Sequence, residues 1–247
     1  MENAQLITLS RISALERQMN VVANNLANVN TTGYKSENLL FEEYIAPVAS
    51  AEEFKFADRD VRFVLDDRTV GNFSTGTVET TGNQFDVAIK GDGFFAVQTP
   101  VGERYTRDGA FTLNPDGQLT THDGHLVLGD GGPIQFNPED TSITISGEGS
   151  ISANSGEIGR LRIVTFDDVQ QLNRKGNNLF EGENPRQLET PRLAQFALES
   201  ANVDAINQIS QMIEVQRSYQ EVANIMRQQN DLRENAIQTL GRVQVNA

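Results

Sequence analysis

Two histidines, His122 and His125, lie three residues apart around Asp123 and Gly124. Together with Asp130 they are the residues whose types and spacing come closest to a metal site, since imidazole and carboxylate groups both bind Zn²⁺. An Asp-Gly turn between two short strands explains the same residues without a metal. We therefore interpret both histidines as exposed residues beside a hairpin turn and expect no metal site.

Other chemistry has weaker support in the sequence. Repeated Asp-Gly pairs could suggest Ca²⁺, but neither the EF-hand loop nor the Gly-rich nonapeptide repeat is present. A G-x-S-x-G nucleophile motif is absent, and a chain with no cysteine has no thiolate nucleophile. No pair of carboxylates is marked by an apolar setting. We expect no catalytic residues and no cofactor, and keep a secreted glycan-active or cation-binding β protein as the less favoured alternative.

Amide side chains are concentrated in "VVANNLANVNTTGYK" at residues 21–35. Val22, Leu26 and Val29 keep the apolar spacing of a helix there, although asparagine is a poor helix former. Asparagines also recur at every fourth position on the face away from this seam. Because an amide can donate and accept hydrogen bonds without burying a charge, this pattern predicts a surface in contact with other protein.

Composition narrows the class of partner. The chain has 247 residues, a formal net charge of −14 and a pI of about 4.6. Such acidity disfavours binding to nucleic acid or to anionic membranes. No apolar stretch approaches 18 residues, so we expect no membrane insertion. The N-terminal residues lack the basic and apolar regions of a secretory signal peptide.

Both ends of the chain read as long helices with narrow apolar seams. Residues 4–29 predict a helix of about 39 Å that is stopped by "NTTG" at 30–33. Asn202 is a plausible N-cap for a second helix of about 57 Å, with no Gly or Pro before Gly241. Such helices are marginal alone. Pairing of the two as an antiparallel hairpin within one subunit explains the seams, but not the amides beside them.

Between the helices the sequence predicts β structure. Asp-Gly pairs at 92–93, 108–109, 116–117, 123–124 and 130–131 separate short alternating segments, which is a hairpin signal because these turns need positive φ. The predicted fold class is α+β, with a coiled-coil-like α domain and a central antiparallel β-barrel or sandwich. The predicted divisions are an N-terminal helix at 1–35, an extended linker with a possible hairpin at 36–71, a β domain at 72–198 and a C-terminal helix at 199–247.

Three stretches resemble the bacterial flagellar axial proteins, the family of rod, hook and hook-associated subunits. "ANNLANVNTTGYK" at 23–35 resembles their N-terminal signature, and the segment 81–129, beginning "TGNQFDVAIKGDGFFAVQ", resembles the β-domain signature of the rod and hook branch. "NVDAINQISQMIEVQRSYQEVANIM" at 202–226 is similar to the family's C-terminal helix. The chain is most similar to the proximal-rod branch, on the length of 36–71 and on its C-terminal tail, with the distal-rod branch as the alternative.

The resemblance implies a structural subunit that leaves the cell through the flagellar type III export apparatus without a cleaved signal peptide. It implies assembly in the periplasm with other copies and with neighbouring rod proteins, the terminal helices forming an inner tube that transmits torque. The residues expected at this assembly interface are Ile12, Leu15, Met19, Val22, Asn24, Asn25, Leu26, Asn28, Val29, Asn202, Val203, Ile209, Met212, Ile213, Gln216, Arg217, Tyr219 and Met226.

Overall fold

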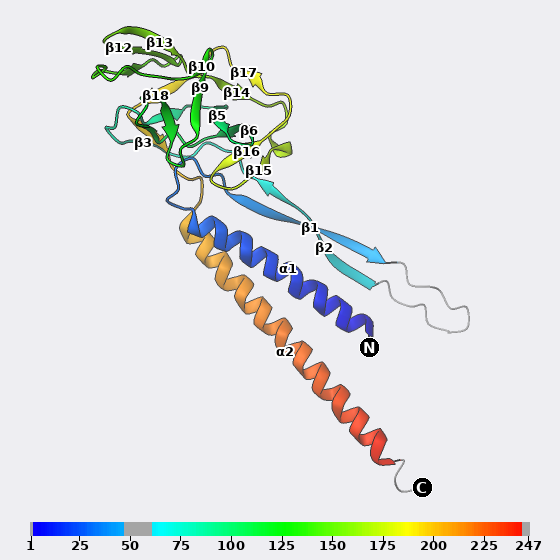
Figure 1. Ribbon diagram of the computed structural model, residues 1–247. Coiled ribbons are helices and arrows are strands. Elements are labelled where there is room, and N and C mark those ends of the chain that lie inside the picture. Colours follow the sequence, from blue (N-terminus) through cyan, green and yellow to red (C-terminus); the bar gives the residue numbers. More distant parts are fainter. Residues whose placement is uncertain (1, 47–60, 244–247) are drawn as a thin grey trace. The chain divides into compact units, whose positions relative to one another are not determined.

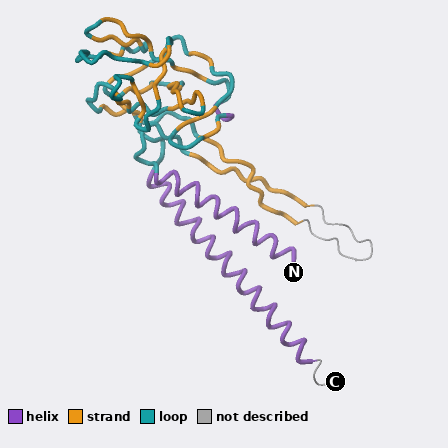
Figure 2. The backbone as a smooth tube through the Cα atoms, in the orientation of Figure 1, coloured by secondary structure: helices purple, strands orange, loops and turns teal. Residues whose placement is uncertain are grey.

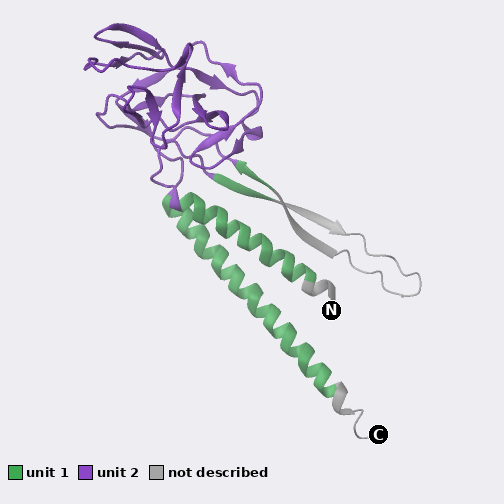
Figure 3. Cartoon of the chain, viewed as in Figure 1, with its two compact units in different colours: residues 1–26, 37–70, 205–247 green, residues 27–36, 71–204 purple. Residues whose placement is uncertain are grey.

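A computed structural model describes residues 2–46 and 61–243. Parts of the predicted 36–71 linker and of the 199–247 segment, namely 47–60 and 244–247, lie outside the described residues, as does Met1. The chain forms two compact units (Figure 3). The helical unit comprises Met1–Leu26, Glu37–Val70 and Ala205–Ala247, and the β unit comprises Ala27–Ser36 and Gly71–Asp204.

Two helices run side by side in the helical unit (Figures 1 and 2): α1, Glu2–Ala27, and α2, Ala205–Val243. Helix α1 ends two residues before the predicted Val29. The chain turns there because the Thr31 amide donates to the Asn28 carbonyl at 3.0 Å and Gly33 adopts φ +65°, which side-chain-bearing residues rarely do. No described helix is long and apolar enough to cross a membrane.

Strands β1, Glu37–Ala46, and β2, Val61–Gly71, pair as a separate two-stranded sheet. The helical unit contains most of both strands, and the β unit begins again at Gly71. The backbone therefore leaves the β unit after Ser36 and returns to it after Val70.

The β unit is built from short, mostly antiparallel strands. Its largest sheet has the order β15-β16-β6-β5-β9-β8-β7, with β10, β14 and β17 paired alongside, while β11-β12-β13, β18-β4 and β19-β3 form smaller sheets. The strands are β3 Val78–Thr80, β4 Val87–Ile89, β5 Phe94–Thr99, β6 Gly102–Thr106, β7 Phe111–Leu113, β8 Leu119–Thr121, β9 Leu126–Gly129, β10 Gly132–Pro133, β11 Thr144–Ile145, β12 Ser150–Ala153, β13 Gly156–Arg160, β14 Ile163–Thr165, β15 Asn173–Arg174, β16 Leu179–Glu181, β17 Arg186–Gln187, β18 Leu193–Gln195 and β19 Ala197–Glu199.

Strand β5 is buried on both faces, which explains its continuous apolar sequence "FFAV". Phe95 and Val97 point into one core cluster, and Phe94 and Ala96 point into a second. Phe95 meets Phe111 edge to face at 5.0 Å between ring centroids. The central sheet therefore has a hydrophobic core on each side.

The structure confirms the α+β class, with two long helices and a mostly antiparallel β core, but the described strands do not close into a barrel. The Asp-Gly interpretation is right at Gly117 and Gly124, whose φ angles are +76° and +82°. The pair at 130–131 also joins two paired strands, β9 and β10, although the φ of Gly131 is not positive. The pair at 92–93 does not form a hairpin, because β4 and β5 do not pair with each other. The interpretation is also wrong at Gly109, whose φ is not positive and whose flanking strands β6 and β7 do not pair. That glycine is needed because a Cβ would lie 1.8 Å from the Val87 carbonyl oxygen.

Tyr105 makes the β unit sensitive to alkaline pH. Burial, together with the Glu103 carboxylate, raises the pKa of Tyr105 to about 12. Above pH 10 the unfolded chain releases the phenol proton while the folded chain keeps it, so folding stability falls as pH rises toward 12. We expect the midpoint of urea unfolding to fall between pH 9.5 and 11 (roughly one unit around the ordinary tyrosine pKa), and to fall less in Tyr105→Phe. Equal slopes for the two proteins would contradict this assignment.

Candidate assembly interface and a buried junction network

Two side-chain contacts set the register of α1 against α2. Asn25 Nδ2 donates to Gln208 Oε1 at 3.2 Å, and the Tyr219 hydroxyl donates to Glu16 Oε1 at 3.3 Å. From the first contact to the second, the residue number on α1 falls by nine and the residue number on α2 rises by eleven, so the helices are antiparallel. The hairpin arrangement weighed from the sequence is therefore present within this chain.

The centre of the seam between the helices is small and aliphatic. Val22, Val215 and Val222 are 2%, 3% and 5% exposed. Val215 was not among the expected interface residues, although its seven-residue spacing from Val222 is a heptad signal. Half-buried residues flank this centre, and they are Ile12, Leu15, Met19, Leu26, Met212, Tyr219 and Met226.

The other expected interface residues lie elsewhere. Ile209 and Ile213 are 47% and 45% exposed. The side chains of Asn24, Gln216 and Arg217 are also exposed. Four expected residues belong to the β unit, and all of them are half-buried: Asn28, Val29, Asn202 and Val203. The expected set is thus divided among a seam, outward faces of the helices, and the β unit.

Asn25 is the buried amide of the helical unit, with 1% of its surface exposed. Its Oδ1 accepts from the Glu37 amide at 2.9 Å and its Nδ2 donates to the Glu37 carbonyl at 2.8 Å. The same Nδ2 contacts Gln208 on α2. One neutral side chain therefore ties α1 to the start of β1 and to α2, which only a group that both donates and accepts can do.

Asn25→Asp should weaken this junction because a carboxylate cannot donate to the Glu37 carbonyl or to Gln208. We expect the helical unit to lose about 1–3 kcal/mol of stability, the cost of unsatisfied buried polar groups. The measurement is thermal loss of helical circular dichroism. Asn20→Asp, on an exposed position of the same helix, is the matched control, and an equal loss in both variants would refute the role of Asn25.

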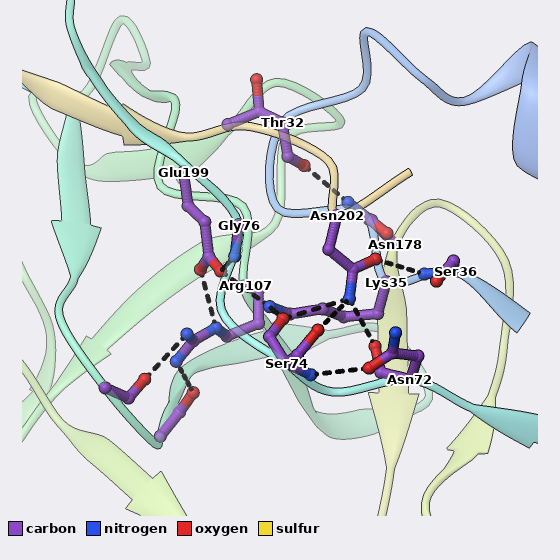
Figure 4. A network of polar contacts seen from close by, with 12 residues as sticks. Thr32, Lys35, Ser36, Asn72, Ser74, Gly76, Arg107, Asn178, Glu199 and Asn202 are labelled. Atoms are coloured by element: carbon purple, nitrogen blue, oxygen red, sulfur yellow. Dashed lines mark hydrogen bonds and ion pairs between the residues drawn. The ribbon is translucent and has the colours of Figure 1, made fainter. Parts of the chain in front are cut away.

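A second polar centre lies inside the β unit, around the carboxylate of Glu199 (Figure 4). Lys35 Nζ donates to Oε1 at 2.7 Å and Arg107 Nε donates to Oε2 at 2.9 Å. All three side chains are at most 4% exposed. The Gly76 amide also donates to Oε1, at 2.8 Å. Both carboxylate oxygens are therefore satisfied, as a buried charge requires.

The two cations of this centre hold further segments. Lys35 Nζ donates to the Ser74 carbonyl at 2.7 Å, and Arg107 donates to the carbonyls of Gly93 and Gly91 at 2.6 and 2.8 Å. Burial lowers the pKa of Lys35, and the Glu199 carboxylate opposes that shift. The centre joins the N-terminal segment of the β unit, the loops at 74–76 and 91–93, and the C-terminal strand β19.

Asn202 belongs to the same polar network as Lys35, since both donate to the Ser74 carbonyl, and it does not cap α2. Helix α2 begins at Ala205, and Asn202 Oδ1 accepts from the Ser36 amide at 2.7 Å. Its Nδ2 donates to the Asn72 carbonyl at 2.7 Å and to the Ser74 carbonyl at 3.1 Å. The N-cap prediction is wrong because these backbone groups compete for the amide side chain.

Lys35, Arg107 and Glu199 were absent from the expected site. Lys35 and Arg107 lie within stretches that resemble the axial family, and Glu199 lies three residues before the third stretch, but 72 to 164 residues separate the three along the chain. The sequence did contain a signal for each of these charged residues. Lys35 lies two residues after Gly33, Arg107 lies two residues before Gly109, and Glu199 ends the strand β19. That signal marks burial but does not say which charges meet.

A polar cleft of about 660 Å³ lies on the described surface of the β unit, and it is lined by Phe166, Leu172 and several carboxylates. Its Glu181 carboxylate pairs with Arg104 at 2.8 Å and with Lys175 at 2.8 Å. Within residues 2–46 and 61–243, no group of three or more His, Asp or Glu side chains is placed to hold a metal ion. His122 is exposed and His125 is half-buried beside the β8–β9 turn.

Three domain families match successive parts of the chain. "Flagella basal body rod protein" matches residues 6–35, "Flagellar hook protein FlgE/F/G D1 domain" matches 88–153, and "Flagellar basal body rod FlgEFG protein C-terminal" matches 194–239. Together they cover α1, much of the β unit and most of α2.

Relatives extend the similarity over nearly the whole chain. The flagellar basal-body rod protein FlgF of Caulobacter vibrioides is 38% identical, covering 98% of this chain and 100% of the relative, and that of Mesorhizobium japonicum is 33% identical over 98% and 99%. A FlgG rod protein of Buchnera aphidicola subsp. Baizongia pistaciae is 32% identical over 87% and 90%.

These similarities define the class of protein as a structural subunit of the flagellar basal-body rod rather than an enzyme. The chain belongs to the flagellar basal-body rod protein family, and its similarity to the FlgF members is greater in identity and coverage than its similarity to the FlgG member compared.

Proposed function

We propose that this rod subunit assembles through its helical unit, with coiled-coil-like packing between the terminal helices of successive copies. The observation that carries the proposal is exposed aliphatic surface on two helices whose mutual seam is already filled. Exposed residues on α1 and α2 are Leu6, Leu9, Ile206, Ile209, Ile213, Ile225, Leu232 and Ile237. So many outward aliphatics on one helix pair are typical of a surface that is covered in an assembly.

The distribution of charge along the chain also favours assembly through the two helices. Helix α1 contains two acidic residues and two arginines, and α2 contains four of each. The formal charge of −14 therefore lies entirely in the segments between the helices. Copies that approach through the helices avoid the repulsion that their other surfaces would meet.

The proposal includes the route and the place of assembly. The subunit is exported by the flagellar type III apparatus, keeps its N-terminus, and joins neighbouring rod proteins in the proximal rod within the periplasm. Retention of α1 is supported by the seam, because this helix supplies one of its two sides.

The test uses a flagellated strain whose own copy of the gene is replaced by this sequence. Isolated basal bodies should contain the chain, and mass spectrometry of its N-terminal peptide should find it starting at Met1 or Glu2. Its absence from basal bodies of swimming cells, or an N-terminus beyond α1, would refute the proposal.

A further inference from the structure

A small cavity lies in the β unit beside the ionic centre of Glu199. Its volume is about 30 Å³, and the residues around it include Lys35, Phe73, Asp92, Phe94 and Arg107. That volume holds one water molecule or one monatomic ion. Sulfate and phosphate, which have several oxygen atoms, need more room than the cavity provides.

The buried charges next to this cavity do not balance. Lys35 and Arg107 are 1% and 4% exposed, and both extend to the single buried carboxylate of Glu199 (Figure 4). Burial lowers the pKa of Lys35, and the opposing effect of the Glu199 and Asp92 carboxylates does not reverse that shift. Asp92 is exposed, so water screens much of its charge. The centre therefore has one positive charge for which its buried side chains supply no counter-ion.

The same two cations have more hydrogen-bond donors than acceptors around them. An ammonium group has three N–H groups, and Lys35 uses two of them, on Glu199 and on the Ser74 carbonyl. A guanidinium group has five, and Arg107 uses three, on Glu199 and on two backbone carbonyls. Within the part of the chain that the structure describes, the other three N–H groups have no acceptor. A ligand that accepts hydrogen bonds and donates none would satisfy them.

We propose that the cavity binds one small monovalent anion between Lys35 and Arg107, chloride being the usual such ion in solution. This ion accepts hydrogen bonds from both cations, supplies the missing negative charge and fits the volume. Water also fits, but it is neutral and brings two more donors to a site that already has an excess of them. The site belongs to the β unit, so it does not depend on the proposed assembly through the helices.

Purified full-length subunit is the material for the test. Sodium chloride replaces sodium gluconate at constant ionic strength, and the backbone amide resonances are followed by NMR. We expect saturable shifts at residues 92–94, which border the cavity. Sodium sulfate at the same ionic strength should give no saturable shift there, because the sulfate ion is too large to enter.

Asp92→Ala tests the charge of the ligand. Asp92 is exposed, so its loss should leave the β unit folded. Removal of a negative charge beside the cavity should lower the Kd for chloride about threefold or more. Asp116→Ala is the matched control, because it removes the same charge at another exposed Asp-Gly turn that does not border the cavity. This control should leave the Kd unchanged.

Chloride that gives no saturable shift in the unsubstituted chain would overturn the inference, and so would equal shifts with sulfate. An unchanged or raised Kd in Asp92→Ala, relative to Asp116→Ala, would show that the ligand is not an anion held beside Asp92 and would overturn it too. The basal-body experiment tests the proposed function separately, so neither result decides the other.

Discussion

Glu199→Gln is expected to destabilise the β unit by about 3–5 kcal/mol, the usual cost of removing one partner from a buried ion pair. The substitution keeps the shape of the side chain but leaves Lys35 and Arg107, which are 1% and 4% exposed, without their counter-ion. Urea unfolding of the full chain, followed by near-ultraviolet circular dichroism of the β-unit tyrosines, measures the change.

The control for that substitution is Glu157→Gln, on an exposed position of β13. A double variant with Lys35→Met tests the coupling, since removal of both partners should cost less than the sum of the single changes. Equal midpoints for Glu199→Gln and Glu157→Gln would contradict the structural role of the ionic centre.

Val22→Asp is expected to abolish rod assembly and swimming. Val22 is 2% exposed at the centre of the seam, and an unpaired buried carboxylate there costs more than about 3 kcal/mol. The β unit has its own two cores and its own ionic centre, so it should stay folded. Loss of motility with unchanged amide spectra for the β-unit residues is the combined readout.

The neighbouring exposed residue supplies the control for the seam. Ala23→Asp adds the same charge one position along α1, on the solvent side, and should leave swimming close to normal. Normal swimming of the Val22→Asp strain, or loss of swimming in both strains, would refute the importance of the seam.

Local sequence signals were sufficient for part of this fold. The helical spacing of Val22 and Leu26 correctly predicts the buried side of α1, and Gly33 marks its end. Asp-Gly pairs predict several hairpin turns because positive φ is a local requirement. These features depend on residues close together in the chain, where spacing alone carries the information.

Helical spacing alone could not predict which residues of α2 face α1. Met212 and Ile213 are adjacent, and the helix has aliphatic residues on several faces. Only contact with α1 selects Met212 and Val215 for the seam and leaves Ile213 outside it. The partners of Asn25 and Glu199 are equally non-local, because a side chain's polarity does not identify a backbone group or a charge far along the chain.

The junction around Glu199 has a mechanical consequence for a subunit pulled through its two terminal segments. The Gly33 amide donates to the Glu199 carbonyl at 2.7 Å, and the Asn202 amide donates to the Tyr34 carbonyl at 3.3 Å. Tension applied at residues 27 and 204 therefore passes directly from the incoming segment to the outgoing one. Most strands of the β unit lie outside this force path, so its outer hairpins can change in length without altering the joint that carries the load.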